Sequence, residues 1–197
     1  MKKAAKLLSA VLCASLIFTG CSKAEMREMM DSFTGEKADT ELKKDVFSKK
    51  YKYEMTVPES WENLNHLFKG DLDNEVDILW AGDLKRGMAV EVTAGYSPYV
   101  GFEVFFKSYI DRLNSERSLS VKRSDFVEKD VNGYKAQYIE LDDIKVSGDD
   151  NTKYKIWSYC IDDEKGIIIF QAIMYQEDAN DEMQQMVESM IQTFRKY

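Results

Sequence analysis

The sequence predicts an α+β fold in which a largely antiparallel sheet of about six to seven strands is covered by two main helices. After residue 50, about seven short runs alternate apolar and polar residues, which is typical of half-buried strands. Turn signals separate several of these runs by only a few residues, as in antiparallel hairpins. Two longer stretches repeat apolar residues at a spacing of three or four, which indicates helices that bury one face each.

The first three strands are expected at residues 51–57, 76–81 and 88–93. Pro58 ends the first of them, because proline has no N–H group to donate to a neighbouring strand. Residues 82–87 begin and end with glycine and are expected to turn the chain between the second and third strands.

A helix is expected at residues 98–116, with Ser97 as its N-cap and Pro98 at its first position. Its apolar residues recur at helical spacing: Phe102, Phe105, Phe106, Tyr109 and Leu113. This face should cover the sheet.

Four further strands are expected, at residues 119–128, 134–141, 153–161 and 167–175. Asn132-Gly133 predicts a hairpin turn, since both residue types tolerate positive φ. Residues 162–166 predict a second hairpin. Residues 167–170 are continuously apolar, which favours a central strand that is buried on both faces.

The chain closes with a second helix, capped by Asp178 or Asn180. Its apolar face is expected to contain Met183, Met186, Val187, Met190, Ile191 and Phe194. Arg195 and Lys196 follow at the end where positive charge stabilises the helix dipole.

Residues 1–20 have the composition of a lipoprotein signal peptide. Lysines precede an apolar stretch at residues 7–18, which is too short to span a bilayer. Residues 16–21, Leu-Ile-Phe-Thr-Gly-Cys, resemble a bacterial lipobox, although Phe18 stands where an aliphatic residue is usual. Cys21 is therefore the predicted lipidation site and the first residue of the mature protein. An ordinary secretory leader is the alternative.

Lipid on Cys21 would place the protein on the extracytoplasmic face of the cell membrane, because two acyl chains give a durable anchor. Residues 21–50 are rich in charged residues and methionine and lack strand alternation, so we expect a flexible tether. Residues 24–30 and 40–47 within it are compatible with short helices. Residues 51–197 form the predicted globular domain.

The net charge is −8, and it becomes −11 without the leader, which contains three lysines and no acidic residue. Such a domain is repelled by nucleic acid, so no nucleic-acid partner is expected. Of the three cysteines, Cys13 leaves with the leader and Cys21 carries lipid. Cys160 then has no partner for an intramolecular disulfide. It lies in an alternating run, which favours a buried small side chain over a reactive thiol.

Residues 55–61 (MTVPESW), 132–136 (NGYKA) and 190–194 (MIQTF) give the chain from about residue 50 to residue 197 a resemblance to the PsbP-like family. The resemblance implies the α/β/α sandwich of a photosystem II extrinsic subunit. Much of that family acts by binding other proteins, and it has no shared catalytic residues. The resemblance therefore implies no catalytic site.

The residues that carry common enzyme chemistry are sparse. His66 is the single histidine, which argues against a Ser-His-Asp hydrolase and against a zinc site built on several imidazoles. No glycine-rich phosphate-binding motif is present. Four acidic residues alternate as calcium ligands do, at Asp71, Asp73, Glu75 and Asp77. Val76 and Gly82 break the EF-hand pattern, so a solvated loop is favoured, and we predict no metal, cofactor or catalytic residue.

Two other groups of residues have more than one interpretation. A polar loop is flanked by Asp142, Asp143, Asp149, Asp150 and Asn151, which are either contacts for a partner or ordinary loop residues. Trp61, Trp80 and Trp157 either line a ligand groove or pack in the core.

These observations favour a non-catalytic protein-binding or adaptor domain with a partner in the cell envelope. The alternative is a small-molecule or metal-binding lipoprotein, such as a transport accessory. A closed apolar cavity with a few convergent polar groups would favour the alternative. An apolar surface patch would favour protein binding. An envelope hydrolase is disfavoured, because the sequence offers no evident general base.

Overall fold

The computed structural model describes residues 42–48, 52–63, 76–83, 88–117, 119–145, 153–164 and 166–197. The predicted leader, Cys21, His66 and the acidic residues 71–75 lie outside these ranges. The elements are β1 (Leu42–Ser48), β2 (Tyr53–Pro58), β3 (Glu62–Asn63), β4 (Val76–Asp83), β5 (Met88–Tyr96), α4 (Phe102–Arg117), η4 (Arg123–Asp125), β6 (Val127–Val131), β7 (Tyr134–Lys145), β8 (Lys153–Asp162), β9 (Gly166–Tyr175), α5 (Asp181–Gln192) and β10 (Arg195–Lys196). None of the described helices is long and apolar enough to cross a membrane.

The predicted fold class is confirmed. Seven strands form one sheet in the order β3-β4-β5-β9-β8-β7-β6, and every neighbouring pair is antiparallel. β9 occupies the centre and is buried at every position from Gly166 to Met174, as its continuous apolar run predicts. Asn132 and Gly133 have φ values of 49° and 87°, which confirms the predicted turn between β6 and β7.

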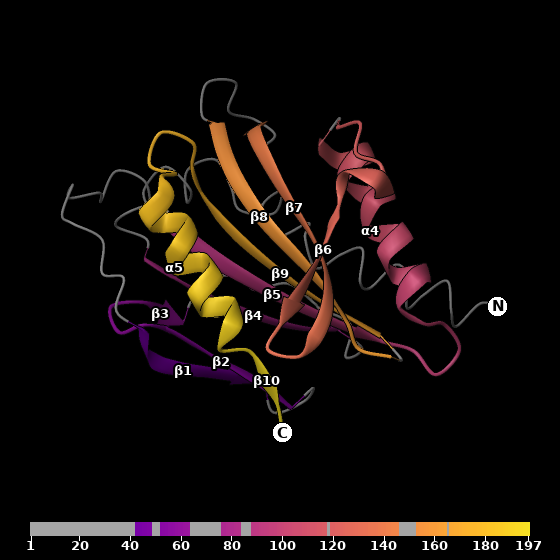
Figure 1. The fold of residues 1–197 in the computed structure, drawn as a ribbon, viewed down its shortest axis with the longest axis horizontal. Helices are drawn as coiled ribbons and strands as arrows, with labels where there is room; N and C mark the ends of the chain where they lie inside the picture. Colours follow the sequence, from indigo (N-terminus) through magenta and orange to yellow (C-terminus); the bar gives the residue numbers. More distant parts are fainter. Residues whose placement is uncertain are drawn as a thin grey trace.

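The two helices cover opposite faces of this sheet (Figure 1). Alternate residues of β9 point to opposite faces of the sheet. Ile168 and Phe170 pack with α5, whereas Ile167 and Ile169 pack with α4. Each such fully buried side chain contributes about 1.5–3 kcal/mol relative to an exposed one. The result is the three-layer sandwich that the resemblance implies.

A second sheet, in the order β1-β2-β10, lies below α5 in Figure 1. β1 pairs antiparallel with β2 from Leu42 to Ser48, inside the segment assigned to the tether. The short helix considered for residues 40–47 is therefore wrong. A backbone partner in β2 decides the conformation there, which the weak local pattern of this segment did not reveal.

Two other boundaries differ from the prediction. α4 begins at Phe102, because the hydroxyl of Ser97 accepts the N–H of Tyr99 (3.1 Å) in a local turn and does not cap the helix. Residues 119–126 are not a strand. The side chain of Asn114 accepts the N–H of Val121 and donates to its carbonyl, which supplies both partners that a neighbouring strand would offer.

The predicted second helix is confirmed, but it ends at Gln192, and Arg195–Lys196 form β10, which pairs with β2. Asn180 is the N-cap of α5, since its Oδ1 accepts the N–H of Met183 at 3.0 Å. The predicted apolar face is buried, with Val187 and Met190 fully enclosed. Thr193, at the C-terminal end of α5, then joins this helix to the smaller sheet, because its Oγ1 accepts the N–H of Thr56 in β2 at 2.7 Å.

Candidate functional site

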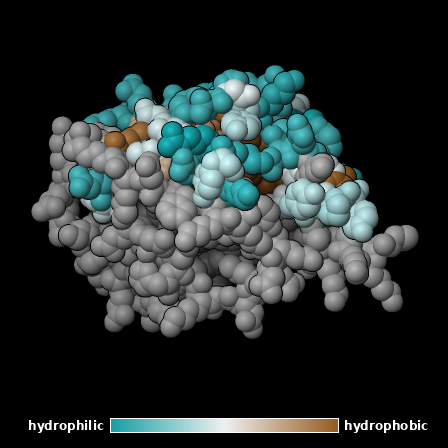
Figure 2. All heavy atoms as spheres, turned by 90° about the horizontal axis from the view of Figure 1, so that it is seen from below, coloured by the Kyte–Doolittle hydropathy of each residue, from teal (hydrophilic) through white to brown (hydrophobic). Residues whose placement is uncertain are grey.

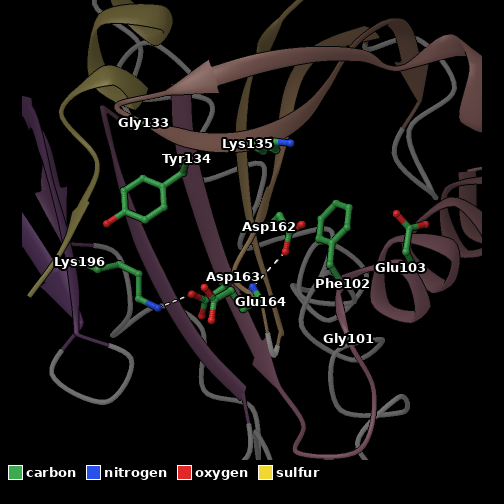
Figure 3. A pocket seen from close by; sticks show the side chains of 10 residues that line it. All are labelled: Gly101, Phe102, Glu103, Gly133, Tyr134, Lys135, Asp162, Asp163, Glu164 and Lys196. Atoms are coloured by element: carbon green, nitrogen blue, oxygen red, sulfur yellow. Dashed lines mark hydrogen bonds and ion pairs between the residues drawn. The ribbon is translucent and has the colours of Figure 1, made fainter.

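Four separate segments enclose a solvent-open cleft of about 750 Å³ at one end of the large sheet (Figure 3). They are the β6–β7 turn, the β8–β9 turn, the start of α4 and β10. The lining residues are Gly101, Phe102, Glu103, Gly133, Tyr134, Lys135, Asp162, Asp163, Glu164 and Lys196.

Strand pairing brings the two turns to the same end. β7 and β8 are antiparallel neighbours, with Ala136 opposite Ile161, so the turns before β7 and after β8 lie side by side. The start of α4 approaches closely, since a Cβ at Gly101 would lie 3.6 Å from the carbonyl oxygen of Glu164. A Cβ at Gly166 would lie 2.2 Å from the carbonyl oxygen of Gly95, so this close pairing of β5 and β9 depends on glycine.

The C-terminal segment forms the remaining wall. Asn132 Nδ2 donates to the carbonyl of Phe194 (2.9 Å), and Gln192 Nε2 donates to the carbonyl of Asp130 (2.9 Å). These bonds hold the segment against the β6–β7 turn. Lys196 then reaches across to form an ion pair with Asp163 in the β8–β9 turn.

The charges of the cleft are only partly neutralised. Glu103 forms a bidentate pair with Arg123, and this hydrogen bonding lowers the pKa of the Glu103 carboxyl. Asp163 is paired with Lys196.

Two further carboxylates are differently placed. Asp162 Oδ1 accepts only the N–H of Glu164, at 3.0 Å, among the described contacts. The carboxylate of Glu164 and the ammonium of Lys135 make no ion pair or hydrogen bond with another described residue.

The cleft also has an aromatic component. The rings of Phe102, which is buried, and Tyr134, which is half-buried, contribute its apolar surface. The tyrosine ring is held edge-to-face against Phe194, with centroids 5.5 Å apart.

Four of the five exposed large hydrophobic side chains in the described part of the chain are close to cleft-lining residues in the sequence or in strand pairing. Tyr99, 78% exposed, and Val104 flank Gly101–Glu103 along the chain, and Tyr197 follows Lys196. Tyr96, 42% exposed, pairs with Gly166, two residues after Glu164. On the face in Figure 2, the coloured residues are mostly hydrophilic, with small, separate hydrophobic areas.

The residues that the sequence singled out lie elsewhere. Cys160 is fully buried, as predicted, and burial raises the pKa of its thiol. Trp61 and Trp157 pack in the core on the α5 side. Asp142 accepts a hydrogen bond from Gln176 and pairs with Lys155, contacts that lower its pKa.

Asp143 pairs with Lys153 at 2.8 Å, so Asp142 and Asp143 both bind their own chain. Within the described ranges, no three His, Cys, Asp or Glu residues are grouped so as to hold a metal ion.

Sequence reasoning did not single out the cleft residues. Glu103, Lys135, Glu164 and Lys196 belong to four segments, and no spacing along the chain connects them. A usable signal was nevertheless present. Both hairpin turns were predicted, and the order of antiparallel strands would place their tips together.

Comparison with known proteins extends to the fold and no further. No family model and no curated protein sequence matches the chain. The solved structure of cyanobacterial PsbP (CyanoP) from Synechocystis sp. PCC 6803 matches with a TM-score of 0.53 and 15% identity, over 83% of this chain and 96% of that one. The Saccharomyces cerevisiae Ran-binding protein Mog1p matches with a TM-score of 0.51 and 12% identity, over 79% and 96%.

A structure from Bacteroides thetaiotaomicron has a TM-score of 0.46 and 13% identity, over 78% of this chain. The match covers 48% of that structure, about half of its length. The fold of the described residues is thus PsbP-like, as the short motifs suggested, and it is shared with Mog1p.

Proposed function

We propose that this protein is a lipid-anchored, extracytoplasmic binding domain that holds another protein at the membrane surface and performs no catalysis. The observation that carries the proposal is an open, charged cleft, with exposed tyrosines at nearby positions of the chain. Tyrosine is enriched among the residues that dominate binding energy at protein interfaces, because its ring buries a large area and its hydroxyl finds a polar partner.

Three described side chains that carry reactive groups are buried, which is compatible with a role without catalysis. Cys160, Tyr109 and Glu91 are each buried beneath α4 or within the sheet. Burial raises the pKa values of Cys160 and Tyr109, so both groups stay protonated. Groups in these positions have no contact with a substrate in solvent.

The fold gives further support. One of the structures that share it carries the name Ran-binding protein, so a sandwich of this kind serves protein binding in that case. The likeness concerns the fold, and the binding surface of the present chain is argued from its own residues.

The proposed anchor is lipid on Cys21, which lies 21 positions before Leu42, the first described residue. Replacing the thiol, as in Cys21→Ser, should remove the anchor, because the lipid is attached through this sulfur. We expect the variant to appear in the soluble fraction or as unprocessed precursor when cell fractions are blotted. Unchanged processing and membrane attachment would contradict the proposed anchor.

Binding is tested by chemical crosslinking in living cells with the full-length protein, followed by its capture and mass spectrometry. One reproducible protein, recovered in near-stoichiometric amount, is the expected result. Recovery of abundant envelope proteins alone, at the level of an unrelated lipoprotein used as control, would contradict the proposal.

A further inference from the structure

We propose that the cleft between the two hairpins receives a basic segment of the partner, inserted through a lysine or arginine side chain. The inference rests on the proposed protein-binding function and specifies the chemistry of the partner. It is argued from the charges that the fold leaves uncommitted, from the apolar surface beside them and from the size of the cleft.

Carboxylates outnumber ammonium groups in the lining by four to two. Lys196 is neutralised by Asp163, and Glu103 is occupied by Arg123. In Figure 3, Asp162 and Glu164 remain at the turn, joined only through the backbone N–H of Glu164. Their two charges exceed the single charge of Lys135, so the unneutralised part of the cleft attracts a cation.

An anionic partner fits the same surface poorly. The positive end of the α4 dipole is met by Glu103, which lies in the first turn of that helix. The chain as a whole has a net charge of −8, which repels acidic segments at long range and steers basic ones toward the protein.

The surface beside the carboxylates suits the stem of a long basic side chain. Lysine and arginine cover apolar surface with their methylene groups while the charged end stays at a polar site. The rings of Phe102 and Tyr134 supply that surface, and a tyrosine face also attracts a cation. The volume of about 750 Å³ accommodates more than one side chain, and the exposed Tyr99 precedes the lining residue Gly101 by two positions.

The test uses the full-length protein in living cells, with a photo-crosslinking amino acid in place of Lys135. The same amino acid at Asp178, in the exposed turn after β9, is the positional control. The whole length of β9 separates the β8–β9 turn, which lines the cleft, from the turn that contains Asp178. A crosslink from both positions would therefore not be specific to the cleft. The crosslinked segment of the partner is identified by mass spectrometry.

The charge requirement is tested by adding Glu164→Lys. Glu164 has a positive φ of 52° that lysine adopts as readily as glutamate, and its carboxylate has no described partner to lose. Reversal should lower the yield of the Lys135 crosslink by about tenfold or more, because juxtaposed like charges repel each other at an interface. Glu164→Gln should give a smaller loss. Glu177→Lys changes the net charge equally at an exposed site away from the cleft, and should leave the yield within about twofold.

The expected result is a crosslink from position 135 but not from position 178, to a segment that contains lysine or arginine. Its yield should fall with Glu164→Lys and stay nearly unchanged with Glu177→Lys. A crosslink that survives Glu164→Lys, or one to a segment without basic residues, would overturn the inference and leave the binding function in place. The inference also fails, with the binding function intact, if chemical crosslinking recovers a partner but the Lys135 position does not. Failure of both methods to recover any partner overturns the binding function as well.

Discussion

The two faces of the seven-stranded sheet are each covered by one helix, but they are stabilised differently. The face of α5 that meets the sheet is apolar throughout, with Met183, Met186, Val187, Met190 and Ile191 buried. α4 also buries aromatic rings, but it covers a set of hydrogen-bonded polar side chains.

That polar set is a row across three strands. Glu91, Gln171 and Ser158 stand opposite one another on β5, β9 and β8. Tyr109 of α4 meets the row: Gln171 Nε2 donates to its hydroxyl at 2.8 Å, and the hydroxyl lies 2.8 Å from Ser158 Oγ. Thr93 Oγ1 donates to Glu91 at 3.0 Å.

The difference concerns how a helix is positioned. Apolar contacts are non-directional, so shape and volume determine where α5 lies. Buried hydrogen bonds tolerate little change in distance or angle, and an unmade one is costly. We therefore expect the polar row to fix the position of α4, whose first residues line the cleft, more narrowly than packing alone would.

The largest expected effect is on the apolar side. Met190→Ala removes a fully buried side chain and should lower the free energy of unfolding by about 2–5 kcal/mol, because the surrounding structure closes the cavity only in part. Denaturant unfolding of the purified protein measures this. Gln185→Ala, on the exposed side of the same helix, is the control and should have little effect. A loss from Met190→Ala below about 1 kcal/mol would show that α5 does not rest on a tightly packed core.

The next effect is on the polar side. Tyr109→Phe keeps the ring but leaves the Gln171 amide and the Ser158 hydroxyl without this partner, and should cost about 1–3 kcal/mol. Tyr99→Phe, at an exposed tyrosine, is the matched control in the same unfolding experiment.

A triple variant separates stability from positioning. Tyr109→Phe with Gln171→Met and Ser158→Ala replaces the three side chains that are joined through the Tyr109 hydroxyl by apolar ones and should recover much of the lost stability. If the row fixes the position of α4, backbone amides of this helix should nevertheless exchange hydrogen faster than in the wild type. Unchanged exchange in α4 would show that packing alone positions both helices.

The two helices also differ in how far the sequence could predict them. The determinants of α5 are local: the Asn180 cap and the apolar stripe lie within the helix or next to it, and both were found. For α4 the apolar face was found but the start was not. Ser97-Pro98 is a common helix start, yet the Ser97 hydroxyl is engaged by the N–H of Tyr99.

The polar row could not be predicted from strand alternation. Alternation places Glu91 and Thr93 on the side opposite Val90 and Val92, but it does not say whether that side meets water or a helix. The cleft was missed for a related reason, since its residues become neighbours only through strand order. β1 likewise becomes a strand only through its pairing with β2.

A smaller effect is expected at the start of α5. Asn180→Ala leaves the N–H of Met183 without its cap and should lower the free energy of unfolding by about 1 kcal/mol. Asn180→Asp keeps an acceptor oxygen in the same place and is the control. Equal losses from both substitutions would show that this end of the helix depends on packing and not on the cap.

The smallest effect contrasts an exposed polar contact of α4 with the buried one. Glu103 pairs with Arg123 at the surface, and its pKa is lower in the folded protein than its value of about 4.3 in an unfolded chain. A lowered folded pKa stabilises the protein above the unfolded pKa, and this contribution disappears as the pH falls through the folded pKa. Because both side chains are largely exposed, it should amount to at most about 1 kcal/mol and shrink in salt.

Glu103→Gln should therefore reduce stability slightly at about pH 6 and by less at about pH 2, because the advantage of the paired carboxylate is lost as the carboxyl takes up a proton. Parallel unfolding curves at the two pH values, in low and high salt, measure the difference. Tyr109→Phe should show neither dependence between these pH values, because the buried hydroxyl stays protonated throughout. If the loss from Glu103→Gln persisted at the lower pH or in high salt, the contact would act through packing, and the exposed and buried contacts of α4 would be of the same kind.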